Sequence, residues 1–326
     1  MENSTQLLWR QEQALANRRV LVVDADDPAL QGLPAEKCHS HADDINVGAQ
    51  QWAPLPLLPE DVDLLIVPLP KAAERLELLL RTLAGATPTA LETWLVGPAK
   101  GGIRGGVTRF EKHADQVTLV DSARHCKLYR GWLRPGPAVT LADASTIISV
   151  AGLEIVSYPG VFGHGRLDEG SAMLLEALDK TDLSGPVLDI GCGSGVLSAA
   201  LARKGCQVHA VDISATAVAA TRATLQRNGL QGQVGGGDLY GGDGHGKKPR
   251  RFQAIITNPP FHDGRLRTTD TTRRLIQGAP DRLRDDGVLW MVANRELPYA
   301  RWLSEGFRRV DVAAESNRFR VYRASR

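Results

Sequence analysis

The chain has 326 residues, of which 43% are hydrophobic and 23% charged, and its formal net charge is +2. Its length exceeds what one hydrophobic core usually supports, so we expect two domains. The composition excludes a disulfide-stapled scaffold, because the chain is long and none of its four cysteines forms a Cys-x-x-Cys pair. It also excludes a membrane protein, since no apolar run approaches the roughly 18 residues of a membrane span. No signal-peptide pattern follows Met1, so we expect a cytoplasmic protein.

Charge is divided unevenly along the chain. Residues 1–160 carry 15 Lys and Arg against 19 Asp and Glu, whereas residues 161–326 carry 24 against 18. A basic second half suits a polyanionic substrate, although a solvated protein surface can have the same composition.

Helix and strand patterns alternate in the first half. Ser4 or Thr5 predicts the start of a helix that runs to about Ala16. Three short apolar runs predict buried strands, and one helix follows from leucines at helical spacing; the strands are residues 20–24, 63–67 and 93–96, and the helix is 70–84. Such alternation predicts a parallel, doubly wound sheet. Paired short strands are predicted over 146–158, and we place a domain boundary near residue 150, which gives domains 1–150 and 151–326.

The second half has clearer patterns. The predicted strands are 187–190, 208–212, 254–257 and 288–293, the helices 196–204, 215–228 and 271–283, and the final antiparallel pair 307–313 and 319–324. This predicts a mostly parallel sheet with an antiparallel C-terminal edge. Residues 63–68 also resemble 254–259, and 92–96 resemble 288–292. We therefore interpret the first domain as a degenerate copy of the second that lost its glycine loop.

A glycine-rich loop, Asp-Ile-Gly-Cys-Gly-Ser-Gly at 189–195, follows one predicted strand and opens a helix. Ligands bind at this end of such sheets, and glycines allow a close approach to the backbone. The Gly-x-Gly-x-Gly spacing differs from that of dinucleotide enzymes. Asp189 would repel a pyrophosphate but suits the cationic amine of S-adenosylmethionine. Asp212 and Asp238 follow the next two strands, where carboxylates can bind the ribose hydroxyls and the adenine amine. The alternative is a tight turn without a ligand.

The tetrapeptide Asn258-Pro259-Pro260-Phe261 ends a predicted strand. Two prolines hold the backbone extended and remove two donors, which leaves carbonyl oxygens free beside the Asn258 amide oxygen. These oxygens can accept both hydrogens of a planar NH2 on a base stacked against Phe261, so that positioning and electrostatics favour methyl transfer to nitrogen. The alternative is a buried Pro-Pro turn with a core phenylalanine.

A second cluster, Cys38, His39 and His41, raises the question of a metal site. We expect these residues to lie in a polar loop, and no fourth ligand follows at a recognised spacing. The sequence therefore predicts no metal.

Residues 189–195 together with 258–261 resemble the class I amino methyltransferases. The wider pattern of residues 159–162, 167–171 and 258–264 is similar to the bacterial ribosomal RNA guanine-N2 methyltransferases, most of all those of the small subunit, and it covers nearly the whole chain. The resemblance implies an α/β protein with two tandem Rossmann-like methyltransferase domains. The second would have a mostly parallel seven-stranded sheet, and the first, a degenerate copy, would help to recognise or support RNA.

The same resemblance implies S-adenosylmethionine as cofactor and N2-methylation of guanine 1207 in 16S rRNA, with the 30S subunit as partner and a monomeric enzyme. Asn258, Pro259, Pro260 and Phe261 would hold the guanine. The cofactor contacts would be Asp189, Gly191, Cys192, Gly193, Gly195, Asp212, Ile213, Asp238 and Leu239, with Phe162, Asp168 and Ser171 near its amino-acid end.

Other functions stay open at this point. A 23S rRNA guanine-N2 methyltransferase shares the tetrapeptide. Protein-glutamine and DNA adenine methyltransferases more often carry Tyr where this chain has Phe261. A non-catalytic RNA-binding protein is a different class, and the intact Asn258 and glycine loop argue against it for the second half.

Overall fold

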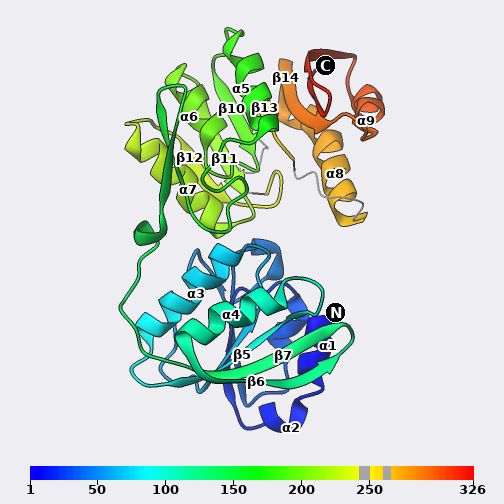
Figure 1. The fold of residues 1–326 in the computed structure, drawn as a ribbon. Coiled ribbons are helices and arrows are strands. Elements are labelled where there is room, and N and C mark those ends of the chain that lie inside the picture. The colour runs from blue at the N-terminus through cyan, green and yellow to red at the C-terminus, as the bar shows by residue number, and fades with distance from the viewer. Residues whose placement is uncertain (242–249, 260–265) are drawn as a thin grey trace. The chain divides into compact units, whose positions relative to one another are not determined.

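The computed structural model describes residues 1–241, 250–259 and 266–326, without the side chains of 266–269. Contacts divide the chain into two compact units, Met1–Ser145 and Thr146–Arg326 (Figure 1). The division falls a few residues before the boundary expected near 150. The reason is that β8 (Thr146–Val150) forms a hairpin with β9 (Leu153–Ser157), and Val156 N of this hairpin donates to Thr224 Oγ1 in the second unit.

The first unit contains, within the described residues, a seven-stranded sheet of order β3-β2-β1-β4-β5-β7-β6. Of these described strands, β7 alone runs opposite to the others, between β5 and β6. The strands are β1 (Arg19–Val22), β2 (Lys37–Ala42), β3 (Gln51–Trp52), β4 (Leu64–Pro68), β5 (Leu91–Pro98), β6 (Ala114–Ala123) and β7 (Cys126–Leu133). One face packs against α1 (Asn3–Trp9), α2 (Glu12–Leu15), η1 (Pro28–Gly32) and η2 (Ile45–Val47), and the other against α3 (Ala73–Ala86) and α4 (Ile103–His113). A short η3 (Ala142–Ala144) precedes the boundary.

The second unit repeats this arrangement. Its described sheet has the order β12-β11-β10-β13-β14-β16-β15, which matches the first when strands are numbered within each unit, and here β16 is antiparallel to its neighbours. The strands are β10 (Pro186–Ile190), β11 (Gln207–Asp212), β12 (Gln233–Gly236), β13 (Phe252–Thr257), β14 (Leu283–Asn294), β15 (Arg309–Glu315) and β16 (Phe319–Ser325). Helices α5 (Glu169–Asp179), α6 (Val196–Arg203) and α7 (Ala215–Arg227) cover one face, and α8 (Leu266–Arg282) and α9 (Tyr299–Gly306) the other (Figure 1). The predicted fold class is confirmed.

Pairing registers align the two sheets residue by residue. Trp94 pairs with Ile66 and Trp290 pairs with Ile256, so matching the two tryptophans, as the comparison of 92–96 with 288–292 does, puts Leu64 in the place of Ala254. Pro68 therefore corresponds to Asn258. The sequence comparison of 63–68 with 254–259 was wrong by one residue, because two apolar strands of similar composition can be aligned in either register.

Two predictions for the first unit were wrong. The helix expected up to Ala16 begins at Asn3 and ends at Trp9, and α2 forms separately. The expected polar loop around Cys38 is instead the strand β2. His41 is fully buried there because both ring nitrogens are hydrogen-bonded: Nδ1 accepts from Asp24 N at 3.1 Å, and Nε2 donates to Ala53 O at 2.8 Å. Burial lowers the pKa of His41, which keeps the ring neutral.

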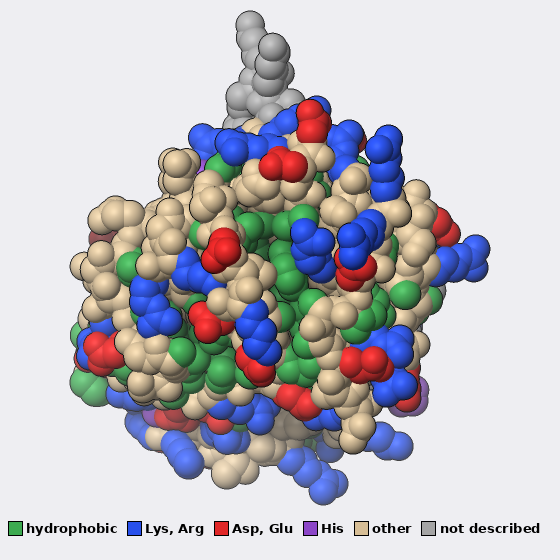
Figure 2. All heavy atoms as spheres, turned by 90° about the horizontal axis from the view of Figure 1, so that it is seen from above, with side chains coloured by type: hydrophobic (Ala, Val, Ile, Leu, Met, Phe, Trp, Pro, Cys, Tyr) green, Lys and Arg blue, Asp and Glu red, His purple; other side chains and the backbone are tan. Residues whose placement is uncertain are grey.

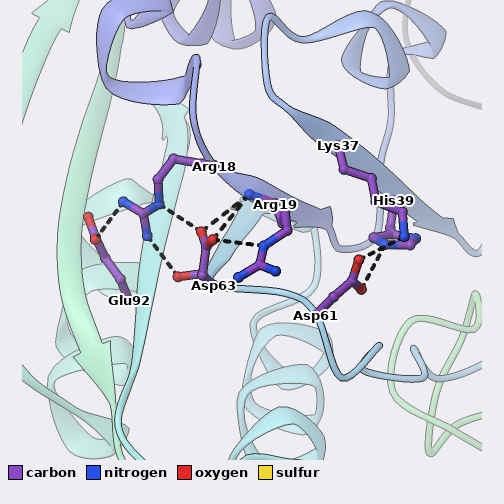
Figure 3. Close-up of polar contacts among 7 residues, drawn as sticks. All are labelled: Arg18, Arg19, Lys37, His39, Asp61, Asp63 and Glu92. Atoms are coloured by element: carbon purple, nitrogen blue, oxygen red, sulfur yellow. Dashed lines mark hydrogen bonds and ion pairs between the residues drawn. The ribbon is translucent and has the colours of Figure 1, made fainter.

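Charged residues join the amino-terminal ends of the strands in the first unit (Figure 3). Arg18 binds Asp63 at 2.7 Å and Glu92 at 2.9 Å, and Asp61 binds both Lys37 and His39. His39 is thus part of a surface ion-pair network. No cluster of three or more His, Cys, Asp or Glu side chains in the described ranges is placed to hold a metal. Likewise, none of the described helices is long and apolar enough to cross a bilayer.

Candidate active site

The candidate site lies at the carboxyl edge of the second sheet, between β10 and β13. Ile190 pairs with Thr257 across these parallel strands, so the segments that begin at Gly191 and Asn258 start side by side. The order of the sheet reverses here, since β11 and β12 lie beyond β10 whereas β14 lies beyond β13. Such a reversal is where open α/β sheets bind their ligands.

The glycine loop requires glycine for two different reasons. Gly191, Gly193 and Gly195 all have positive φ, of 75°, 55° and 77°. A Cβ atom on Gly191 or Gly193 would meet nothing within 4 Å, whereas one on Gly195 would lie 2.9 Å from Thr221 Cα. The first two glycines therefore border open space that a ligand can occupy, and the third allows the loop to pack against α7.

Side chains of neighbouring elements hold this loop in shape. Thr221 Oγ1 donates to Gly193 O at 3.0 Å, and Thr224 Oγ1 donates to Ser194 O at 2.7 Å. Asp212 Oδ2 accepts from Gly193 N at 3.0 Å. Its Oδ1 accepts from Ser214 N at 2.9 Å, so this carboxylate joins the glycine loop to the start of α7. The sequence identified Asp212 as a candidate residue but not the two threonines. Their spacing of three residues on one helix face was the signal that could have identified them.

Asp189 is a buried carboxyl with one free oxygen. The residue is only 1% exposed, and Ser198 Oγ donates to its Oδ2 at 2.6 Å. Burial raises the pKa of Asp189 to about 7, and the charge of Asp212 adds a smaller increase. Neighbouring Cys192 is buried as well, and burial raises the pKa of its thiol well above the usual value. A cation next to Asp189 would stabilise the ionised form of its carboxyl. The Cys192 thiol stays protonated, and a buried, protonated thiol is unreactive.

Asn258 presents an amide oxygen without a partner among the described residues directly after β13, the strand that pairs with β10. Its Nδ2 donates to Ser171 Oγ at 2.9 Å and to Asp168 Oδ1 at 3.2 Å. In the described part of the chain, Asp189 Oδ1 and Asn258 Oδ1 are the two buried side-chain polar atoms without a hydrogen-bond partner. An unsatisfied buried acceptor costs about 1–3 kcal/mol, which a ligand that donates to it would recover. The residues present therefore fit a cofactor with a cationic amine and an acceptor with an NH2 group.

The other predicted residues that the structure describes differ in exposure. Phe162 and Ile213 are 58% and 36% exposed. Asp238 forms an ion pair with Arg274 at 3.0 Å, a partner that the sequence did not suggest, and Leu239 next to it is buried.

Asp168 and Ser171 contact Asn258 directly, whereas the resemblance implied only a place near the cofactor. Pro259 is buried directly after Asn258. Pro260 and Phe261 lie outside the described residues, and so do His262, Asp263 and Gly264.

On the face of the molecule drawn in Figure 2, surface charge does not by itself mark where a polyanion binds. Figure 2 shows Lys and Arg side chains interspersed with Asp and Glu around hydrophobic side chains on the face seen from above. The positive excess of residues 161–326 is thus not gathered into one area of this face. The buried oxygens of Asp189 and Asn258 that lack a partner in the described structure locate the candidate site instead.

Comparison with known proteins bears on the family of this chain. The family model described as "Methyltransferase small domain" matches residues 152–323, and "Methyltransferase small domain N-terminal" matches residues 5–145. The ribosomal RNA small subunit methyltransferase C of Alcanivorax borkumensis is 56% identical, with 99% of each chain covered. The protein of the same name from Chromohalobacter salexigens is 42% identical over 78% of this chain and 76% of its own.

A solved structure shares the whole fold. The 16S rRNA N2 G1207 methyltransferase (RsmC) of T. thermophilus, in complex with AdoMet and guanosine, superposes with a TM-score of 0.83 at 24% identity, over 100% of this chain and 92% of that one. The family models cover both units, and the Alcanivorax relative is similar over its full length. The chain therefore belongs to the methyltransferase small domain family and, within it, to the ribosomal RNA small subunit methyltransferases C.

Proposed function

We propose that this chain transfers the methyl group of S-adenosylmethionine to the exocyclic N2 amine of a guanine in 16S rRNA, the nucleotide being guanine 1207. The observation that carries the proposal is the pair of buried, unpartnered oxygens, Asp189 Oδ1 and Asn258 Oδ1, on adjacent strands. One suits a cationic amine and the other an NH2 donor. The names of the relatives agree with this choice of substrate.

Each residue has a defined role in this proposal. S-adenosylmethionine supplies, when bound, a methyl group on a positively charged sulfur. Asp189 binds the amine of its amino-acid part, Asp212 its ribose and Asp238 its adenine amine, while the backbone at Gly191 and Gly193 leaves the space that it fills.

The guanine is held by the segment that begins at Asn258. Asn258 Oδ1 and the carbonyl at Pro259 accept the two hydrogens of the guanine amine, which directs the nitrogen lone pair at the methyl group. Pro260 and Phe261 complete the guanine site. No strong base is needed, since the methylated nitrogen is acidic enough to lose its proton to water.

The first unit supports RNA recognition rather than chemistry. All predicted cofactor and acceptor residues belong to the second unit, so we propose that one chain forms a complete site and acts as a monomer. The substrate is the rRNA of the 30S subunit, and the enzyme would act in the cytoplasm, where ribosomal subunits are found.

The test is transfer of labelled methyl to 16S rRNA, free and in 30S particles, with the modified nucleoside identified by mass spectrometry. We expect N2-methylguanosine as the product. Label found in 23S rRNA, in protein or on adenine would contradict the proposal, and so would a failure to bind S-adenosylmethionine.

Asn258→Ala tests the acceptor role. We expect it to abolish transfer while the affinity for S-adenosylhomocysteine stays within about threefold of the wild type, since it removes no cofactor contact. Asn228→Ala is the matched control, because the Asn228 amide binds only the backbone of Glu154 and Thr224, away from the site. A folded Asn258→Ala variant that loses cofactor binding would show that this residue is misassigned.

A further inference from the structure

The amide of Asn258 is held by residues at the amino-terminal end of α5. Its Nδ2 lies 2.9 Å from Ser171 Oγ, 3.2 Å from Asp168 Oδ1 and 3.4 Å from Asp168 Oδ2. Its Oδ1 is buried and without a partner among the described residues. One end of the amide is thus fully engaged, and the other is left for a ligand.

The chemistry of the partners decides which end is engaged. An ionised carboxylate can only accept hydrogen bonds, so Asp168 must face the NH2 of the amide. Ser171 cannot make this choice alone, because a hydroxyl both donates and accepts. With Asp168 in place, a rotated amide would bring two oxygens together at about 3 Å, which is repulsive. Asp168 therefore determines that oxygen, and not NH2, faces the open side.

Backbone closes the remaining space around this contact. Gly170 lies between Asp168 and Ser171, and a Cβ atom on it would lie 3.2 Å from Asp168 Oδ1 and 3.4 Å from Asn258 Oδ1. Any side chain at position 170 would therefore press on both Asp168 and Asn258, and glycine leaves this contact undisturbed.

We propose that Asp168, assisted by Ser171, is a positioning residue that fixes the Asn258 amide with Oδ1 toward the acceptor base, and so makes the site select an exocyclic NH2. This inference rests on the proposed function, because it assumes that a base enters beside Asn258. A base that lacks the amine leaves a buried acceptor unpaired, which costs about 1–3 kcal/mol. A freely rotating amide would lose this discrimination.

Asp168→Asn separates this role from a structural one. Asp168 also caps α5, since its Oδ1 accepts from Ser171 N at 3.1 Å. Asparagine caps helices as well as aspartate does, so the helix and the melting temperature should be retained. The new amide can, however, donate to Asn258 Oδ1, which permits the rotated orientation.

The readout is binding of labelled guanosine and inosine, which lacks the 2-amino group, to protein saturated with S-adenosylhomocysteine, by equilibrium dialysis. We expect the wild type to bind guanosine at least about tenfold more tightly than inosine. Asp168→Asn should reduce this preference to about threefold or less and lower kcat for 16S rRNA about 10- to 100-fold. Because Asp168 is also expected near the amino-acid end of the cofactor, each variant is saturated with S-adenosylhomocysteine at its own measured affinity, so that the nucleoside preference is compared at full cofactor occupancy.

Two further variants complete the experiment. Asp168→Ser keeps a capping residue but is too short to reach Asn258, and it should lose the preference for guanosine in the same way. Asp44→Asn, the same substitution at the cap of η2 in the first unit, should change none of these quantities.

A folded Asp168→Asn or Asp168→Ser protein that retains the wild-type preference for guanosine would overturn the inference. Failure of the proposed function is a separate result, since it would appear as a wild type that transfers no methyl group to 16S rRNA, whereas nucleoside binding is measured without turnover.

Discussion

Cofactor binding should depend on pH through Asp189. Burial raises the pKa of this carboxyl to about 7, so half of the molecules carry a proton there at neutral pH before a ligand binds. An ammonium group can bind Oδ1 only when the carboxyl is ionised. The pKa of Asp189 is raised in the empty site and falls when the ammonium group binds. The affinity therefore reaches its full value well above pH 7 and weakens as the pH drops below 7.

The size of the effect follows from the ionised fraction. The apparent Kd is proportional to 1 + 10^(7 − pH), because only the ionised carboxyl binds the amine. Binding at pH 6 should therefore be about tenfold weaker than at pH 8, a difference of about 1.4 kcal/mol in binding free energy. Uptake and release of protons give an independent measure. About half a proton should be released per molecule bound at pH 7, and nearly one at pH 6.

Calorimetric titration with S-adenosylhomocysteine tests this directly. Its amine stays protonated from pH 6 to 8, and buffers of different ionisation enthalpy report the proton release. Asp189→Asn should bind about 10- to 100-fold more weakly, with no pH dependence over this range. Equal wild-type affinity at pH 6 and pH 8, or a variant that keeps the tenfold change, would refute the assignment of Asp189 to the cofactor amine.

Three substitutions should change stability by amounts that their contacts predict. Gly195→Ala places a Cβ against Thr221 at a positive φ and should cost about 3 kcal/mol, seen as a lower melting temperature; an unchanged melting temperature would mean that α7 moves aside. Arg75→Ala leaves Asp24 without its partner at 2.8 Å in a buried pair and should cost about 3–5 kcal/mol in urea unfolding, whereas a loss below about 1 kcal/mol would show that water reaches Asp24. Lys204→Ala removes an ammonium that donates to three carbonyls at the end of α5 and should lower the melting temperature by about 2–4 °C, as calorimetry would record; no shift would indicate that water replaces it.

The parts of the site that could be predicted are those that depend on local sequence. Gly191 and Asn258 each follow a short apolar strand, and a parallel sheet brings the carboxyl ends of its strands to one edge whatever the details of packing. Their neighbours could not be predicted in the same way. Asp168 contacts Asn258 across 90 residues, and no spacing rule links a helix cap to a strand end so far along the chain.

Two of the missed strands, β2 and β6, lack the apolar face that a sequence pattern can reveal. β2 is polar in sequence, and its burial depends on hydrogen bonds from the His41 ring to Asp24 N and Ala53 O. β6 was missed because it is an edge strand with mostly exposed side chains and two register shifts, which obscure an alternating pattern. β7 is different, since its buried and partly exposed residues alternate and this signal was overlooked. Hydrophobic periodicity finds elements that bury an apolar face, so strands stabilised by polar contacts or open to water give little signal.

Comparison of the two sheets shows that the same fold can be kept without the polar residues of the candidate site. With the strands aligned by their pairing, the places of Asp189, Asp212 and Asn258 are taken in the first unit by Val22, Ala42 and Pro68. Each acceptor for a ligand has become an apolar side chain buried in the first unit.

The glycine loop has an equally different counterpart. Asp24 stands in the place of Gly191, keeps a positive φ of 57°, and binds the guanidinium of Arg75. The backbone turn has thus survived, while an internal cation, only 3% exposed, occupies the side of the turn that a ligand would need. Strand order and backbone conformation are therefore not sufficient for cofactor binding. On the function proposed here, binding depends on a buried acceptor left unpaired, which the second unit has at Asp189 and the first unit lacks at Val22.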